Sequence, residues 1–373
     1  MHYILAMIIA VILYNLQASY YRKHWQDNLH AKVSYNKTHA NIGEIITLTE
    51  QVNNEKHLPL PVLYVKFSTS RSFLFEDMDN AALSDRYHRN DIFSVMGQQQ
   101  IIRKLQFRTT KRGYYAIDHL DLVVHDLFMK ESFANKEANH TALYVYPALL
   151  TDRNSLSLTS SIIGDLTQTD LYEDPLSFRG IREYRNGDSM RYINWKATAK
   201  TNDLMVNTYF DTQNTQVVLL FNLETNLIQR DDKLHEYMIR VVTTLLHHMN
   251  NRDFAIRLAI NITDPLTEEV ITTDVGKGEE HLQSLLELLS RLDLSRELTP
   301  FQDFFHDKYA LFNQTNSNTS YMIVSNYRKE ALLSEFYDKK HQGHHIYFLC
   351  PELAKLCSPA KDIQYWEVMP DEI

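Results

Sequence analysis

One long run of hydrophobic residues opens the chain. From Tyr3 to Leu16 the sequence is apolar except for Asn15, and Ala18 to Tyr21 extends the run. A membrane-spanning helix needs roughly 20 apolar residues. We therefore predict a transmembrane anchor over residues 1–22, and a buried first helix of a soluble domain is the alternative.

Charge around this run predicts its orientation. No Lys or Arg precedes it, whereas Arg22 and Lys23 follow immediately. Positive residues favour the cytoplasmic side, and a signal peptide has the opposite charge order. We expect an uncleaved single-pass anchor in the cell membrane with the bulk of the chain in the cytoplasm. Tyr20, Tyr21 and Trp25 are expected in the headgroup region.

Short runs of alternating polar and apolar residues follow, and they predict an all-β sandwich of the fibronectin or Ig type over residues 30–150. The predicted strands are Ala31–Tyr35, Ile45–Val52, Leu63–Ser68, Ile101–Thr109, Tyr114–Ile117, Leu120–His125 and Ala142–Tyr146. Three polar stretches predict loops instead, namely Glu76–Gln100, Asn135–His140 and Asn154–Asp170.

Strands and helices alternate over residues 216–373, which predicts a Rossmann-like α/β domain. Gln216–Leu223 is a continuous apolar run, as in a parallel strand that is covered on both faces. The other predicted elements are the helices Lys233–Met249, Glu280–Leu292 and Glu330–Lys339 and the strands Phe254–Ile260, Tyr321–Val324, His345–Leu349 and Ile363–Val368.

Residues 151–215 connect the two predicted domains and contain the most distinctive stretch. Asn186-Gly187 predicts a tight turn, and Asp188 is placed to cap a helix that carries Met190 and Ile193 on one face. An alternating strand follows the helix. Basic and aromatic residues are dense here, and the notable ones are Arg179, Arg182, Tyr184, Arg185, Arg191, Tyr192, Trp195, Lys196 and Lys200.

This stretch resembles the signature of the DUF58 family. The matching residues are Phe178, Arg179, Gly180, Arg182, Tyr184, Gly187, Asp188, Arg191, Ile193, Trp195, Lys196, Ala197, Ala199, Lys200, Leu204 and Val206. The resemblance implies a bacterial or archaeal protein, often membrane-anchored, with a von Willebrand factor A-like domain. It also implies a MoxR-type AAA+ ATPase as partner, together with other membrane proteins.

A von Willebrand factor A-like fold raises the question of a metal site. Members with an adhesion-type site carry Asp-x-Ser-x-Ser after the first strand, whereas this chain has Asn222-Leu223-Glu224-Thr225-Asn226. Glu224, Asn222 and Asn226 could supply oxygens, with Asn326 or Ser325 from a later strand. We expect no cofactor here, and a Mg²⁺ site with a degenerate ligand set is the alternative.

Composition excludes several functions. The net charge of −9 argues against a nucleic-acid binder. Cys350 and Cys357 are too far apart for a CxxC pair, and the histidines at 341, 344 and 345 lack accompanying carboxylates. We expect a non-enzymatic adaptor, in which Trp195 and Tyr184 pack against the sheet. The arginines would form ion pairs with acidic residues, namely Arg179, Arg182 or Arg191 with Asp188, Glu183 or Asp203. Anion or nucleotide binding by the basic stretch, and metal-dependent ligand binding, remain the alternatives.

Overall fold

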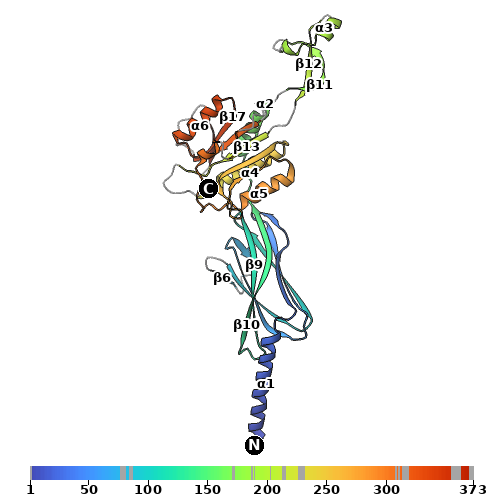
Figure 1. Ribbon diagram of the computed structural model, residues 1–373, viewed down its shortest axis with the longest axis vertical. Helices are drawn as coiled ribbons and strands as arrows, with labels where there is room; N and C mark the ends of the chain where they lie inside the picture. The colour runs from blue at the N-terminus through green and yellow to red at the C-terminus, as the bar shows by residue number, and fades with distance from the viewer. Residues whose placement is uncertain are drawn as a thin grey trace. The chain divides into compact units, whose positions relative to one another are not determined.

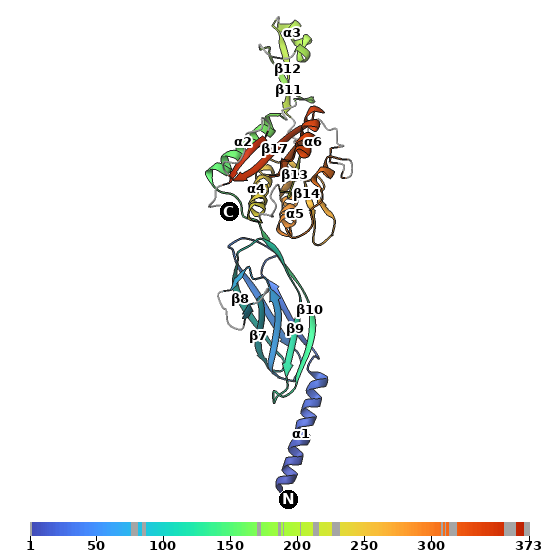
Figure 2. The same ribbon diagram turned by 90° about the vertical axis from the view of Figure 1, so that its left-hand side faces the viewer.

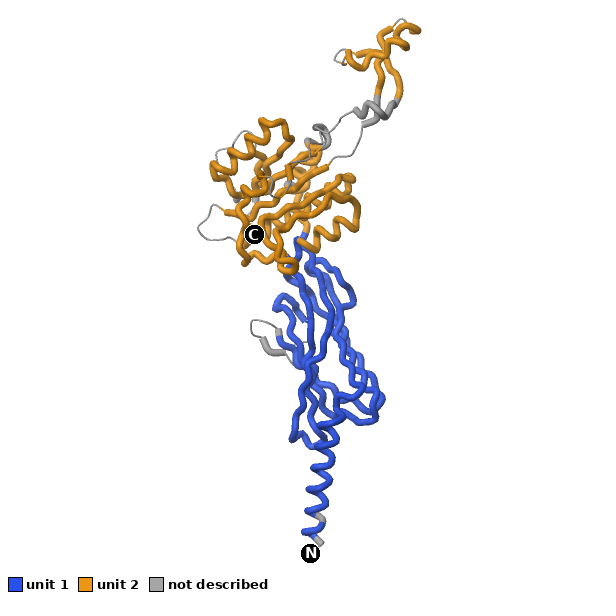
Figure 3. The backbone as a smooth tube through the Cα atoms, viewed as in Figure 1, with its two compact units in different colours: residues 1–148, 289–291 blue, residues 149–288, 292–373 orange. Residues whose placement is uncertain are grey.

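The structure is a computed structural model that divides the chain into two compact units, coloured separately in Figure 3. One comprises residues 1–148 and 289–291, and the other comprises residues 149–288 and 292–373. The residues described are 2–75, 81–83, 87–169, 173–185, 188, 190–201, 203–211, 216–225, 232–306, 309, 311–312, 319–353 and 363–368.

Helix α1 (His2–His24) opens the first unit and is drawn in blue in Figure 1. Within the described chain it is the one helix long and apolar enough to cross a membrane, with a mean hydropathy of 1.6 over Tyr3–His24. Its side chains are largely exposed, because only 6% of the apolar window is buried. An apolar surface of this length favours the predicted anchor.

The end of α1 corrects the prediction for the aromatic residues. Tyr21 and Trp25 are buried in the core of the β domain, whereas Tyr20 stays exposed. The Tyr21 hydroxyl donates to the Pro59 carbonyl at 2.7 Å, and the Trp25 ring stacks on Phe133 at 6.4 Å. Tyr21 and Trp25 therefore fasten the helix to the β domain and do not lie among lipid headgroups.

Two packed sheets form the β domain, as predicted. The first contains, in spatial order, β1 (Leu29–Tyr35), β3 (Ile45–Asn54), β8 (Gln99–Thr109) and β5 (Phe73–Phe75). The second contains β2 (His39–Asn41), β10 (Ser132–Tyr146), β9 (Gly113–His125), β4 (Leu60–Thr69), β7 (Tyr87–Val95) and β6 (Ala81–Leu83). Long strands β9 and β10 run side by side in Figure 2. Alternate residues such as Val33, Leu48 and Phe107 point inward and are fully buried.

Side chains of β10 close the free edge of β1. The backbone N–H groups of Ala31, Val33 and Tyr35 donate to side-chain oxygens of Glu137, Asn139 and Thr141, at 3.2, 3.0 and 3.4 Å. These acceptors are spaced two residues apart, as are the donors, so one strand face satisfies the edge of another. The stretch 135–140, predicted as a loop, is therefore part of a strand.

The two other predicted loops also contain regular structure. β7 lies within Glu76–Gln100, and helix α2 (Arg153–Thr169) occupies most of Asn154–Asp170. α2 was predicted as a loop because it is rich in serine and threonine, which are common in loops. Hydroxyls of Thr159 and Ser160 bond back to carbonyls four residues earlier, at 2.7 and 2.8 Å, so they are satisfied within the helix.

The second unit contains a six-stranded sheet. In spatial order its strands are β15 (Val270–Thr272), β14 (Ala255–Thr263), β13 (Gln216–Phe221), β16 (Thr319–Val324), β17 (His345–Leu353) and β18 (Ile363–Val368). Numbered along the chain, this order is 3-2-1-4-5-6, and β15 alone is antiparallel among these strands. That is the order of a doubly wound Rossmann-like sheet.

Helices cover both faces of this sheet, as its apolar strands require. They are α4 (Asp232–Asn250), α5 (Gly278–Ser290) and α6 (Glu330–His341), with the short helix η2 (Phe301–Phe304). α6 and η2 share one core with Leu220 and Ile323. The indole N–H of Trp366 on β18 donates to the Tyr237 hydroxyl on α4 at 3.0 Å, and this hydrogen bond connects β18 to α4.

Candidate functional site

The signature stretch forms a hairpin of its own, which we call the signature hairpin. Strands β11 (Glu173–Glu183) and β12 (Met205–Asp211) pair in a separate two-stranded sheet. Between them lie a single turn of 3-10 helix, η1 (Met190–Tyr192), and the short helix α3 (Trp195–Thr201). The helix predicted to start after Asp188 is thus split into two shorter pieces.

Asp188 holds the turn of the signature hairpin in place. Its two carboxylate oxygens accept from the Arg182 guanidinium at 2.6 and 2.7 Å, and one also accepts from the Arg185 backbone N–H at 2.8 Å. Because of the Arg182 hydrogen bonds, and then that of Arg185, the pKa of Asp188 falls to about 2. The predicted ion pair between Arg182 and an acidic residue is therefore present.

Asn194 is the residue that caps α3, and sequence reasoning missed it. Its side-chain oxygen accepts from the Ala197 N–H at 3.0 Å, the usual N-cap geometry. Its amide group donates to the Asn207 side chain at 2.7 Å, and its backbone N–H donates to Met205 at 2.8 Å. Asparagine is a typical N-cap residue, so its position directly before Trp195-Lys196-Ala197 was the sequence signal for this cap.

Large apolar side chains of the signature hairpin face solvent. Trp195 is 67% exposed and Met190 is 65% exposed, which corrects the prediction that Trp195 packs against a sheet. Tyr184 is half-buried. Among the hairpin residues whose side chains are described, only Ile193 and Val206 are buried hydrophobics. The hairpin thus presents apolar surface instead of covering it.

Basic side chains of the same hairpin are also exposed. Arg185, Lys196 and Lys200 are exposed, and the exposed Arg191 guanidinium lies over the Tyr192 ring at 5.4 Å. Of the remaining predicted residues, Phe178 and Arg179 belong to β11 by their backbones, while their side chains fall outside the description. Gly187 also lies outside the described residues.

A second candidate site lies where β13 and β16 end, at the switch point of the α/β sheet. Asn222 is fully buried there, and its amide donates to Ser325 Oγ at 3.0 Å. Its side-chain oxygen accepts from Asn261 at 2.9 Å and from the Glu224 N–H at 2.9 Å. Three residues predicted for this site thus meet in one hydrogen-bonded network, namely Asn222, Glu224 and Ser325. Asn261 is a fourth member, which the sequence analysis did not predict.

This network does not fit a divalent cation well. The Asn222 oxygen already accepts two hydrogen bonds, and Glu224 accepts a long one from Phe301 N–H at 3.4 Å. Burial raises the pKa of Glu224, which disfavours the charged form that a hard cation prefers. Asn326 follows Ser325, and Asn226 lies outside the described residues. No group of three His, Cys, Asp or Glu able to hold a metal occurs among the residues searched.

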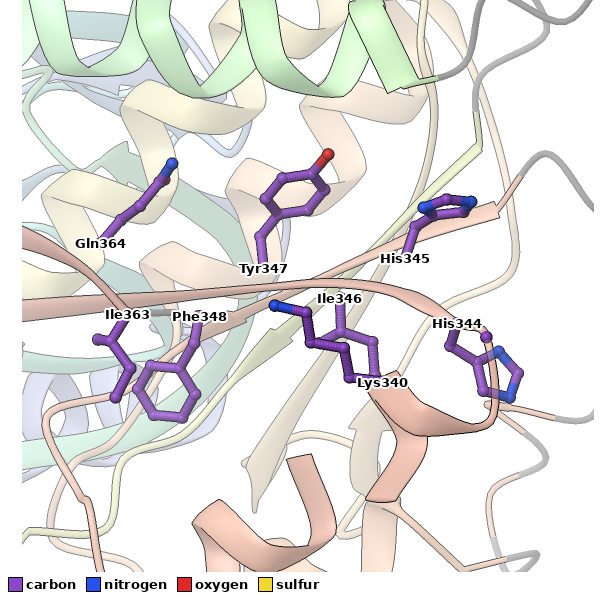
Figure 4. A pocket seen from close by; sticks show the side chains of 9 residues that line it. Lys340, His344, His345, Ile346, Tyr347, Phe348, Ile363 and Gln364 are labelled. Carbon is purple, nitrogen blue, oxygen red and sulfur yellow. The ribbon is translucent and has the colours of Figure 1, made fainter. Parts of the chain in front are cut away.

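A pocket of about 500 Å³ lies at the opposite ends of β17 and β18. Figure 4 shows His344, His345, Tyr347 and Gln364 around the strand, with Lys340 beneath it. Burial, and secondarily the nearby Lys339, lower the pKa of His344, so the site favours a neutral imidazole. The residues that line this pocket include no carboxylate that could pair with His344 or His345.

Comparison with known proteins points to the segment that contains the signature hairpin. Residues 180–311 match the family model DUF58, described as "Protein of unknown function DUF58". The predicted resemblance is confirmed for this part of the chain. The DUF58 match begins in β11 and continues through the first half of the α/β sheet, so it includes both candidate sites in part. Among curated proteins, none matches this chain.

Solved structures similar to the chain cover about a third of it. A non-cellulosomal cohesin from Archaeoglobus fulgidus has 14% identity and a TM-score of 0.22, covering 31% of this chain and 90% of its own. A CARDB domain from Pyrococcus furiosus has 10% identity and a TM-score of 0.21, covering 32% and 90%. A type II cohesin domain from Acetivibrio cellulolyticus has 10% identity and a TM-score of 0.23, covering 30% and 94%. Such low TM-scores carry no argument about function.

Proposed function

We propose that this chain is a membrane-anchored, non-enzymatic interaction protein that docks on a partner through the signature hairpin. The observation that carries the proposal is the exposure of Trp195 and Met190 on an element with little core of its own. A two-stranded hairpin is marginally stable alone in water. A partner surface that covers these side chains would supply the apolar burial that the hairpin lacks.

The chemistry of this surface suits protein recognition. Tryptophan and arginine are the residues that most often dominate the binding energy of interfaces, and methionine adapts to irregular apolar surfaces. Trp195 and Met190 supply exposed apolar side chains, and Arg185, Lys196 and Lys200 supply exposed positive charges on the same hairpin. A partner with an apolar groove bordered by acidic residues has the complementary surface.

The partner we propose is a MoxR-type AAA+ ATPase, acting with this chain in the assembly or maturation of a protein complex. Support comes from the DUF58 match together with the family resemblance of the signature. We interpret the α/β domain as von Willebrand factor A-like, because its strand order and the antiparallel β15 agree with that interpretation. At the switch point of its sheet, the polar side chains of Asn222, Ser325 and Asn261 hydrogen-bond to one another. This favours a role in protein contact over catalysis of a reaction.

We further propose that α1 anchors the chain in the cell membrane, with the β domain and the second unit in the cytoplasm. The apolar length of α1 supports the anchor, and the basic residues Arg22, Lys23 and His24 in its last turn support the orientation.

Affinity capture from native membranes tests the docking proposal. The wild-type chain should recover the ATPase, and Trp195→Ser should reduce recovery about tenfold or more, since a central aromatic anchor contributes at least about 2 kcal/mol. Leu266→Ser is the matched control, because Leu266 is also a large exposed hydrophobic residue, 53% exposed, outside the signature hairpin. Equal recovery by wild type and Trp195→Ser would contradict docking through the hairpin.

Anion binding by the hairpin is a second candidate, favoured by the exposed cations Lys196 and Lys200 and by the Arg182 pair, which neutralises the Asp188 carboxylate. Calorimetry with inorganic phosphate and with ATP would detect it. Binding that disappears in a Lys196→Ala, Lys200→Ala variant supports this candidate, whereas absence of heat with the wild-type chain rejects it.

A further inference from the structure

The turn between β9 and β10 exposes three consecutive apolar residues. Leu127 is 49% exposed, and Phe128 and Met129 are each 64% exposed. A contiguous apolar patch on a soluble domain marks an interaction site more often than a single exposed side chain does. This turn therefore needs a covering surface.

Buried Asp126 gives the turn a fixed shape. Its side-chain oxygen accepts from the Lys130 and Glu131 backbone N–H groups at 2.7 and 3.1 Å, and its carbonyl accepts from Met129 N–H at 3.0 Å. Met129 adopts a φ of +56°, which few non-glycine residues do. The protein thus maintains a specific backbone shape whose result is to present apolar side chains to the outside.

The turn lies against the apolar part of α1. The Phe128 ring is 5.6 Å from the Tyr14 ring, and Lys130 Nζ lies over that ring at 5.1 Å. Glu131 pairs with Arg22 at 2.8 Å. Tyr14 lies inside the apolar run. The β9–β10 turn thus contacts α1 from Tyr14 to Arg22, which is about two helical turns.

Helix length then decides where the turn must be. Tyr21 is already buried in the β domain, which leaves about 18 residues, Tyr3–Tyr20, to cross the membrane. At 1.5 Å per residue they extend about 27 Å, slightly less than the roughly 30 Å hydrocarbon core. A span therefore needs this whole stretch, and Tyr14 lies about 10 Å deeper than Tyr21 along the helix axis. Whatever contacts Tyr14 is below the membrane surface.

We infer that Leu127, Phe128 and Met129 insert into the bilayer leaflet next to the β domain, as a second membrane contact beside α1. The inference rests on the proposed anchor. The Lys130 ammonium lies over the Tyr14 ring at the same depth, where a cation–π contact offsets part of the cost of bringing a charge below the headgroups. Arg22 and Lys23 lie in the last turn of α1, about 12 Å nearer the membrane surface than Tyr14, so the headgroups that fit this surface are anionic.

Depth measurements on the full chain in nanodiscs of phosphatidylcholine and phosphatidylglycerol test the inference. Cys350 and Cys357 are first replaced by Ser, and single cysteines are then introduced as Phe128→Cys, Met129→Cys, Tyr14→Cys or Leu74→Cys. Each cysteine carries an environment-sensitive fluorophore, and quenching by brominated lipids is compared with quenching by aqueous iodide. Leu74, 58% exposed on β5, is the matched control for an exposed residue of the same domain.

Brominated lipids should quench the label at positions 14, 128 and 129, and iodide should quench it at position 74. Lipid quenching at position 14 with iodide quenching at 128 and 129 would overturn the inserted turn while leaving the anchor intact. Iodide quenching at position 14 would reject the anchor itself, and with it the inference. Equal lipid quenching at 128 in nanodiscs of phosphatidylcholine alone would reject the preference for anionic headgroups.

Discussion

Two bidentate Arg–Asp pairs in the described part of the chain lie in opposite surroundings. Arg89 and Asp91 on β7 have side chains that are 1% and 0% exposed, with contacts of 2.8 and 3.0 Å. Arg182 and Asp188 in the signature hairpin are 40% and 19% exposed, with contacts of 2.6 and 2.7 Å. The two pairs have the same chemistry and similar distances, so any difference between them reflects burial.

Burial changes what such a pair does. Removing one partner of a buried pair leaves a charge without water, whereas an exposed pair is replaced by water at little cost. The buried pair belongs to a larger cluster, because Arg103 contacts Asp91 at 3.2 Å and Glu50 lies fully buried beside them. The exposed pair shapes one turn. The first pair is thus a requirement of the fold, and the second is a local constraint on the signature hairpin.

Asp91→Ala should have the largest effect. It leaves the Arg89 guanidinium buried without its carboxylate, and we expect a loss of about 3–5 kcal/mol in the free energy of unfolding of the β domain. Hydrogen exchange of core amides in β3 and β7 measures it. Asp121→Ala, at an exposed position on β9, is the control and should change stability by less than about 0.5 kcal/mol. Equal effects of the two variants would contradict the comparison.

Glu50→Gln should have an intermediate, pH-dependent effect. Burial, and then the neighbouring Asp91, raise the pKa of Glu50 to about 9 in the folded chain. A raised pKa means that the fold favours protonated Glu50, so its contribution to stability is complete below about pH 4.5 and is lost as the pH rises toward 9. Glutamine stays neutral.

The Gln variant should therefore be more stable than wild type at about pH 8, and the advantage should shrink toward about pH 5. Urea unfolding of the β domain at both pH values measures it. An advantage that grows on acidification would show that Glu50 is ionised in the fold.

Asp188→Asn should have the smallest effect on stability. The pKa of Asp188 is lowered to about 2, so its pair with Arg182 persists on acidification to about pH 4 and is lost as the pH falls through about 2. We expect unchanged thermal unfolding of the chain at neutral pH, with faster hydrogen exchange confined to the hairpin amides near Arg185. Destabilisation as large as that of Asp91→Ala would remove the distinction between the two pairs.

Hydrophobic periodicity predicted the sheets but not the polar interior. The alternation of β3 and the apolar run of β13 reveal strands because side-chain burial follows backbone geometry directly. β7 escaped prediction because Arg89 and Asp91 occupy inward positions where the pattern requires apolar residues. The two charges neutralise each other two residues apart on one strand, and the sequence pattern alone does not show that this strand buries them.

The candidate site shows the same limit. The Asp188 pair with Arg182 could be proposed from composition, since acidic and basic residues alternate there. The exposure of Trp195 could not, because the sequence does not reveal that η1 and α3 replace a single amphipathic helix. The burial of Tyr21 and Trp25 was equally hidden, since aromatic residues after an apolar run suit a membrane interface as well as a core.

The hydrogen bonds from the β1 backbone to side chains of β10 also protect the edge of the sheet. Exposed strand edges recruit other strands, and this is how folded domains join into aggregates. Here Glu137, Asn139 and Thr141 already occupy the donors that a foreign strand would need. The β domain thus resists polymerising along this edge, and the protection comes from three polar side chains in place of another strand.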